Sequence, residues 1–132
     1  MSMKPIIAAL LFYFSAMAAA YGCSCVPLPP QERRDHSSTV FIGQVAALRE
    51  QGSVRHYEFQ VGEILKGAPA ERLVVSSSGS SAACGSSFEQ GISYLIYADG
   101  ATGHLTTHLC KGNCDAASSD GKAEIEALRG RK

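Results

Sequence analysis

The sequence lacks an excess of charge of either sign, and charged residues are few. Its 12 Lys and Arg residues balance its 12 Asp and Glu residues, and only 18% of the chain is charged. Proteins that bind nucleic acid or acidic membrane surfaces usually carry basic patches that outweigh their acidic residues. The composition therefore argues against both partners, and we expect neither.

The chain also lacks the residue patterns of common catalytic sites, so we expect no enzyme. A nucleophilic enzyme needs a Ser or Cys beside a His and an orienting carboxylate. The sequence has four His residues, but no nucleophile-elbow motif and no spacing typical of a known enzyme family frames them. The run SSSGSSAACGSS (76–87) contains Gly-Ser-Ser-Ala rather than Gly-x-Ser-x-Gly, and we interpret it as a flexible surface loop. Glu124 and Glu126 would point in different directions on a helix, which indicates a solvated face.

The His and Cys residues offer few arrangements that could bind a metal ion. On a strand, His104 and His108 would lie about 13 Å apart, which is too far to share an ion. The pairs Cys-x-Cys and Cys110-x3-Cys114 could hold zinc in principle, but export would favour their oxidation. We therefore expect no bound metal and no cofactor.

Residues 1–22 are typical of a secretory signal peptide. They combine a single charge, Lys4, with an apolar run too short to span a bilayer and a following stretch of small residues. Cleavage before Tyr21 or before Cys23 fits this pattern. One alternative is a lipobox, with Cys23 as a lipidated N-terminus. The other is that these residues form a buried N-terminal helix. We expect a secreted protein, extracellular or periplasmic, with no membrane attachment unless Cys23 is lipidated.

Five cysteines remain for a mature chain of about 110 residues, a size at which a single domain is only marginally stable without help. They are Cys23, Cys25, Cys84, Cys110 and Cys114. The odd number leaves one without a partner in the chain. Cys23 and Cys25 are too close along an extended segment to pair easily, so we expect each to reach a distant cysteine.

The mature chain predicts one domain, residues 23–132, made mostly of short strands. The expected strands are 39–47, 55–64, 72–76, 92–98 and 104–110. Gly43 suggests a bulge in the first strand, and the fourth is apolar on both faces, as in a strand covered on both sides. Five short strands separated by turns are typical of a small antiparallel barrel or sandwich.

Two helical segments are expected outside these strands. Residues 31–37 can form a short turn that begins at Pro30. Residues 122–128 predict a C-terminal helix whose Ala123, Ile125 and Leu128 face the body of the domain.

Four segments in sequence order resemble one family. They are CSCVP (23–27), YEFQVGEILKG (57–67), CGSSF (84–88) and YLIYADGATGHLTTHLC (94–110). Together they resemble the N-terminal domain of the tissue inhibitors of metalloproteinases, a netrin-like, OB-fold family. The chain has neither the third disulfide of that domain nor the second domain of the animal inhibitors. In this it is similar to the short netrin-like relatives among bacterial secreted proteins.

The resemblance implies a fold and a disulfide pattern. The fold is an all-β, five-stranded, OB-like closed barrel with a small α content in a C-terminal helix. The implied disulfides are Cys23–Cys84 and Cys25–Cys110. Cys114 is then the odd thiol, in a loop outside the barrel.

The resemblance also implies a mechanism, that of a monomeric inhibitor whose partner is a zinc metalloprotease. We name residues 23–27 the wedge. The α-amino nitrogen and carbonyl oxygen of Cys23 would chelate the catalytic zinc of the protease, with Ser24 pointing into the pocket beside it. Cys25, Val26 and Pro27 would lie along the cleft like a substrate. The alternatives are a non-inhibitory netrin-like binding module and a lipoprotein of the cell envelope.

Overall fold

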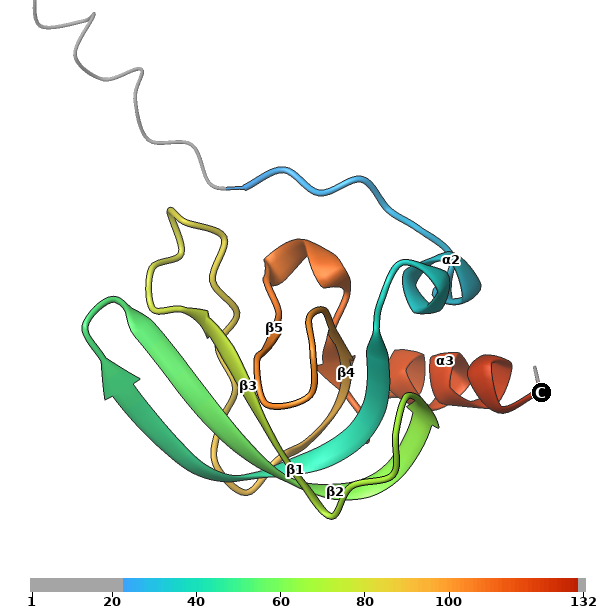
Figure 1. Cartoon of the computed structure of the whole chain (residues 1–132). Helices are drawn as coiled ribbons and strands as arrows, with labels where there is room; N and C mark the ends of the chain where they lie inside the picture. Colours follow the sequence, from blue (N-terminus) through green and yellow to red (C-terminus); the bar gives the residue numbers. More distant parts are fainter. Residues whose placement is uncertain (1–22, 131–132) are drawn as a thin grey trace, which may run out of the picture.

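A computed structural model describes residues 23–130, so the expected signal peptide lies outside the described residues. The domain is mostly β, with one curled sheet and a helix near its C-terminus (Figure 1). The elements in chain order are α2 (Pro30–Asp35), β1 (Thr39–Gln51), β2 (Val54–Lys66), β3 (Arg72–Ser78), β4 (Ser93–Ala98), β5 (Leu105–Thr106), the 3-10 helix η1 (Leu109–Lys111), β6 (Cys114–Asp115) and α3 (Ser119–Arg129).

The strands form a single sheet in the order β5-β3-β2-β1-β4-β6, which curls into a half barrel (Figure 1). All neighbours are antiparallel except β3 and β5, which pair in parallel through Val75 and Leu105. An isolated antiparallel bridge between Asp99 and Thr106 joins the residue after β4 to β5. The described chain thus has six strands, not the expected five.

The last expected strand, 104–110, is largely wrong. Only Leu105 and Thr106 pair with β3, and the chain then turns into η1. The backbone N–H of Leu109 donates to the carbonyl of Cys84 at 2.8 Å, which takes it out of the ladder. Leu109 is consequently 51% exposed.

Gly43 lies at a bulge in β1, as its place in the strand predicts. The register of β1 against β2 shifts between Ile42 and Gly43. A Cβ at Gly43 would lie 2.9 Å from the ring of Phe41 and 3.1 Å from the Cβ of Phe59. A side chain has no room here, so glycine allows the strand to bend around the core.

Two apolar clusters lie on opposite sides of the sheet. Inside the curl, buried side chains come from every main strand and from the β3–β4 loop: Phe41, Val45, Tyr57, Phe59, Leu73, Val75, Phe88, Ile96, Ala98 and Leu105. Phe88 packs edge-to-face on Tyr57, with ring centroids 5.0 Å apart. This contact fixes the end of the β3–β4 loop to the core.

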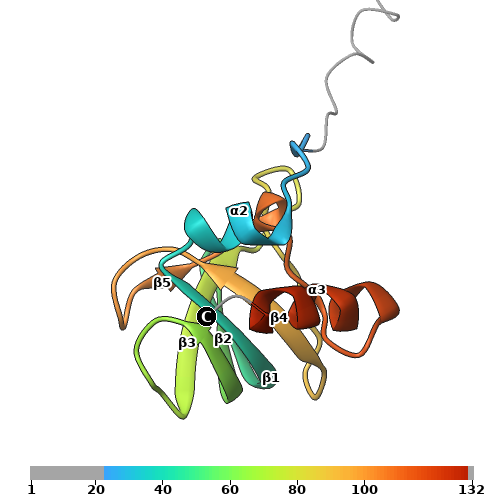
Figure 2. The same ribbon diagram turned by 90° about the vertical axis from the view of Figure 1, so that its right-hand side faces the viewer.

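The second cluster lies between the sheet and α3, which packs beside β4 (Figure 2). Leu95 and Tyr97 of β4 face Ile125 and Leu128 of α3, so β4 is covered on both faces, as expected. Ala123, expected to face the body, is exposed instead. None of the helices in residues 23–130 is long and apolar enough to cross a membrane.

Candidate functional site

The wedge is tied to the domain by two disulfides. Cys23 is bonded to Cys84 in the β3–β4 loop, and Cys25 is bonded to Cys110 in η1, with Cα atoms 5.6 and 5.1 Å apart. These are the two pairs that the resemblance implies. The wedge and the residues after it run over the β3–β4 loop and η1 toward α2 (Figure 1).

The loop that carries Cys84 is ordered by its own hydrogen bonds, which corrects the expectation of a flexible serine-rich loop. The N–H of Ser86 donates to Oγ of Ser77 at 2.8 Å, and both residues are buried. Cys84 adopts a positive φ of 61°. At Gly85 a Cβ would overlap the carbonyl oxygen of Ser78, so only glycine fits this close approach.

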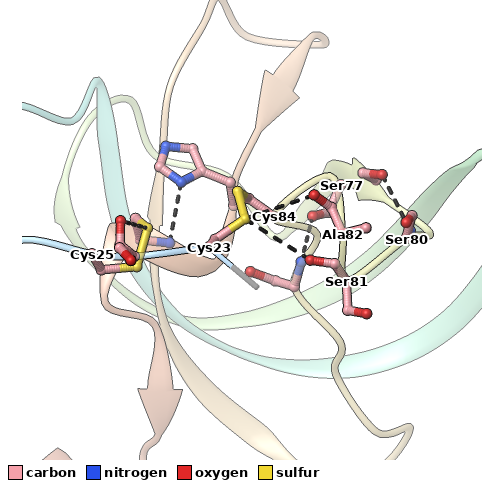
Figure 3. The surroundings of a disulfide bond; sticks show 12 residues. Cys23, Cys25, Ser77, Ser80, Ser81, Ala82 and Cys84 are labelled. Carbon is pink, nitrogen blue, oxygen red and sulfur yellow. Dashed lines mark hydrogen bonds between the residues drawn. A yellow bond between two sulfur atoms is a disulfide. The ribbon is translucent and has the colours of Figure 1, made fainter. Parts of the chain in front are cut away.

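The two disulfides lie side by side because their loops are hydrogen-bonded to each other. The bond from the N–H of Leu109 to the carbonyl of Cys84 joins the residue before Cys110 to the partner of Cys23. Figure 3 shows Cys23 bonded to Cys84 next to the carbonyls of Ser81 and Ala82. The Sγ atom of Cys23 lies 3.9 Å from the carbonyl oxygen of Ser81.

The wedge itself is exposed. Residues 24–27 are accessible to solvent, and Val26 is 79% exposed. Within the part of the chain that the structure describes, no backbone–backbone hydrogen bond involves residues 23–28. Leu109, the residue before Cys110, is also exposed. The disulfides therefore hold an accessible segment with apolar side chains in place without burying it.

Beyond the prolines, a polar cluster holds α2 against α3. Arg33 forms an ion pair with Oε1 of Glu124, and its guanidinium lies 6.0 Å from the ring centroid of Tyr97. The hydroxyl of Tyr97 donates to the same Glu124 oxygen at 2.6 Å. The burial of this hydroxyl and its bond to Glu124 raise the pKa of Tyr97.

The interpretation of Glu124 as a solvated residue is therefore wrong, although Glu126 is exposed. The side chain of Glu124 is only 13% exposed. A signal existed in the sequence, because Glu124 lies three residues after Gly121 and four before Leu128, both on the buried face of α3.

Further polar contacts fix the end of α2, which buries none of its residues. Nζ of Lys66 donates to the carbonyl of Arg34 at 2.9 Å. Nζ of Lys111 donates to the carbonyl of His36 at 3.2 Å and to Asp99 at 3.0 Å. Because Lys111 follows Cys110 directly, the same short helix η1 contacts both the wedge and the end of α2.

Cys114 lies in the short strand β6, paired with Leu95 of β4, and not in a loop as expected. It is the free cysteine of the described chain and is partly buried. Burial and the neighbouring carboxylate of Glu124 raise the pKa of its thiol to about 11. The thiol is therefore protonated at physiological pH, which lowers its reactivity.

No resident metal site is visible in residues 23–130, where no three His, Cys, Asp or Glu side chains gather closely enough to hold an ion. His104 and His108 are both exposed, and His108 caps η1 by accepting from the N–H of Cys110. Comparison of the sequence with known protein families and with curated proteins gives no match.

Proposed function

We propose that the protein is a secreted inhibitor of zinc metalloendopeptidases, of the netrin-like kind to which tissue inhibitors of metalloproteinases belong. One observation carries the proposal: an exposed Cys-Ser-Cys-Val-Pro segment has both cysteines bonded to adjacent loops of a β domain. Disulfides are typical of proteins outside the reducing cytosol, which supports export.

The sheet supports an OB-like barrel, although it is an open half barrel with an additional strand. An OB-fold is a five-stranded, partly open Greek-key barrel. The parallel pairing of β3 with β5 and the bridge from Asp99 to Thr106 bring the two ends of the curl together. In this assignment β1 to β5 form the barrel, while β6 and α3 are additions that cover β4.

The mechanism follows from the chemistry of the first residue of the mature chain. With cleavage before Cys23, its α-amine and carbonyl oxygen can chelate one metal ion together. The chelate would fill the open position of the protease zinc and displace the water that performs hydrolysis. Ser24 would then lie beside the zinc, and Cys25 to Pro27 would occupy the cleft in the manner of a substrate.

The two disulfides contribute affinity by fixing the segment before it binds. A segment already held in its bound shape loses less conformational entropy on docking. Prolines strengthen this effect, because each of them disfavours helical conformations in the residue that precedes it. Val26 and Leu28 both precede a proline.

The α-amine provides the direct test. Only a free, uncharged amine can donate its lone pair to zinc, and an added residue would turn it into an amide. We expect protein that starts at Cys23 to inhibit a susceptible zinc endopeptidase. A form with one Ala before Cys23 should lose at least about 100-fold in affinity, or about 2.7 kcal/mol. The measurement is the inhibition constant of both forms against the same protease.

Two controls make the outcome decisive. Intact mass establishes the first residue and any lipid on Cys23, and circular dichroism establishes that both forms are equally folded. Equal potency of the two forms would show that the N-terminus is not the zinc ligand. A correctly processed form that inhibits no protease would instead favour a netrin-like binding module.

A further inference from the structure

The segments that the two disulfides bring together around the wedge contain no charged side chain. Three segments meet there, and we name them together the neutral rim: residues 23–29, 76–88 and 105–110. None of them contains Asp, Glu, Lys or Arg, in a chain of which 18% is charged. The two disulfides join these segments, and the N–H of Thr107 donates to the carbonyl of Ser76 at 3.0 Å.

Two of the charged side chains that border the neutral rim, Arg55 and Lys111, have partners within the domain, whereas Glu89, next to Phe88, is exposed and forms no ion pair within residues 23–130. Arg55 donates to Oγ of Ser87 at 3.1 Å and also pairs with Glu50. Lys111, next to Cys110, is buried and pairs with Asp99. Arg55 and Lys111 therefore add little net field to the rim, and the short helix α2 carries two basic and two acidic residues.

The neutral rim contains one histidine, His108, and its four cysteines are all in disulfides. The Nδ1 atom of His108 accepts a hydrogen bond from the N–H of Cys110 at 3.2 Å. The exposed groups of the rim are instead apolar or hydroxyl-bearing, among them Val26, Leu109 and Ser81.

We propose that the partner is a zinc endopeptidase whose cleft is bordered by uncharged, largely apolar residues, and that it binds without electrostatic steering. The proposal rests on the inhibitor function proposed above. A charged border on the protease would be desolvated against the neutral rim without gaining a partner, and this desolvation is unfavourable. Without steering, association takes place at the rate of neutral protein pairs, about 10⁵–10⁶ M⁻¹s⁻¹.

The salt dependence of the association rate constant tests whether the two proteins bind without electrostatic steering. The probes are zinc endopeptidases of known structure, grouped by the charge of the residues around their clefts. Raising the NaCl concentration from about 0.01 M to about 0.1 M shortens the Debye length from about 30 to about 10 Å. We expect the association rate constant to change by less than about twofold, whereas steered pairs gain 10-fold or more from their charges.

Charge substitution on the neutral rim tests whether the cleft of the partner has an uncharged border. Ser81→Lys and Ser81→Asp place either sign on the rim, and they spare the loop because Ser81 contributes its carbonyl to the bond with the N–H of Cys84. Each should weaken inhibition of a protease with an uncharged cleft border at least about tenfold, since the new charge would be desolvated without a partner. Ala127→Lys on the exposed side of α3 is the control and should change nothing.

The outcomes separate the two proposals. Inhibition restricted to proteases with charged borders, steep salt dependence, or full potency of both Ser81 variants would overturn the neutral-partner inference and leave the inhibitor function standing. If the correctly processed wild-type protein inhibits no member of any group, the inhibitor function fails, and this inference fails with it.

Discussion

Residues 23–35 are held at their two ends, the wedge and α2, by different kinds of interaction. We call these the covalent end and the polar end. At the wedge, Cys23 and Cys25 form covalent bonds that close sequence separations of 61 and 85 residues, and the backbone around them stays exposed. At α2, an ion pair between Arg33 and Glu124 and two hydrogen bonds, from Lys66 and Lys111, hold a helix that buries no residue. A disulfide needs no burial, so it can fix a segment and still leave it free to bind a partner.

The largest expected effect comes from removing the Cys23–Cys84 disulfide at the covalent end. Cys84→Ser frees Cys23, and since no backbone–backbone hydrogen bond of the described chain holds residues 23–28, the first residues of the wedge lose their fixed position while Cys25 stays bonded to Cys110. We expect inhibition to weaken by about 100-fold or more. The domain should remain folded through Cys25–Cys110 and its core, with a stability loss of at most about 4 kcal/mol. Inhibition constants and circular dichroism measure the two effects.

The matched control is Cys114→Ala, which removes a cysteine but no disulfide. It should leave inhibition unchanged. If circular dichroism shows that the Cys84→Ser domain is unfolded, the Cys23–Cys84 bond is required first by the fold, and the separation between the two ends does not hold.

The sequence predicted the main strands and α3 better than the contacts that fix the wedge and α2. The two disulfide pairs were implied only by the family resemblance. Alternation and turn residues predicted β1 to β4 and α3, and the glycine at 43 predicted the bulge. These signals are local and repeat along the chain. The strand expected at 104–110 failed because the tertiary hydrogen bond of Leu109 to Cys84 competes with the ladder, and no local pattern encodes that bond.

The polar end depends on contacts between residues far apart in the chain. Arg33 and Glu124 are separated by 91 positions, so neither sequence neighbourhood identifies the other as a partner. The same holds for β6, whose two residues pair with Tyr94 and Leu95 of β4, about 20 positions earlier in the chain. Strands this short have no periodicity to detect.

A smaller effect is expected at the polar end. Glu124→Gln keeps an acceptor for the hydroxyl of Tyr97 but leaves the charge of Arg33 without a partner in a partly buried site. We expect a loss of about 1–3 kcal/mol in the free energy of unfolding. Inhibition should weaken about threefold to tenfold, because α2 positions the residues that follow the wedge. Glu126→Gln, on the exposed side of the same helix, is the matched control.

Urea denaturation and inhibition constants separate the two contributions. Equal stability of the two Gln variants would show that the ion pair with Arg33 contributes nothing measurable. A loss of stability with unchanged inhibition would mean that the disulfides alone determine the geometry of the wedge.

The smallest effect concerns Cys114, which lies next to the polar end and takes no part in the covalent one. With the thiol pKa raised to about 11, we expect iodoacetamide to label the folded protein slowly at neutral pH and faster as the pH approaches that value. Protein in urea, with its disulfides intact, should react readily. Peptide mapping should find the label on Cys114 alone, and a label on Cys84 or Cys110 would contradict the disulfide pattern.

The same thiol links stability to pH. The folded state keeps a proton that the unfolded chain releases near its ordinary pKa of 9.0, so the contribution of Cys114 is complete below pH 9. It is lost as the pH rises from about 9 to about 11, because the unfolded state then binds fewer protons than the folded state. Cys114→Ala should reduce this alkaline loss of stability without abolishing it, since the raised pKa of Tyr97 acts in the same direction. Urea denaturation of both proteins across that pH range measures the difference, and parallel curves would show that the thiol is not desolvated as the structure indicates.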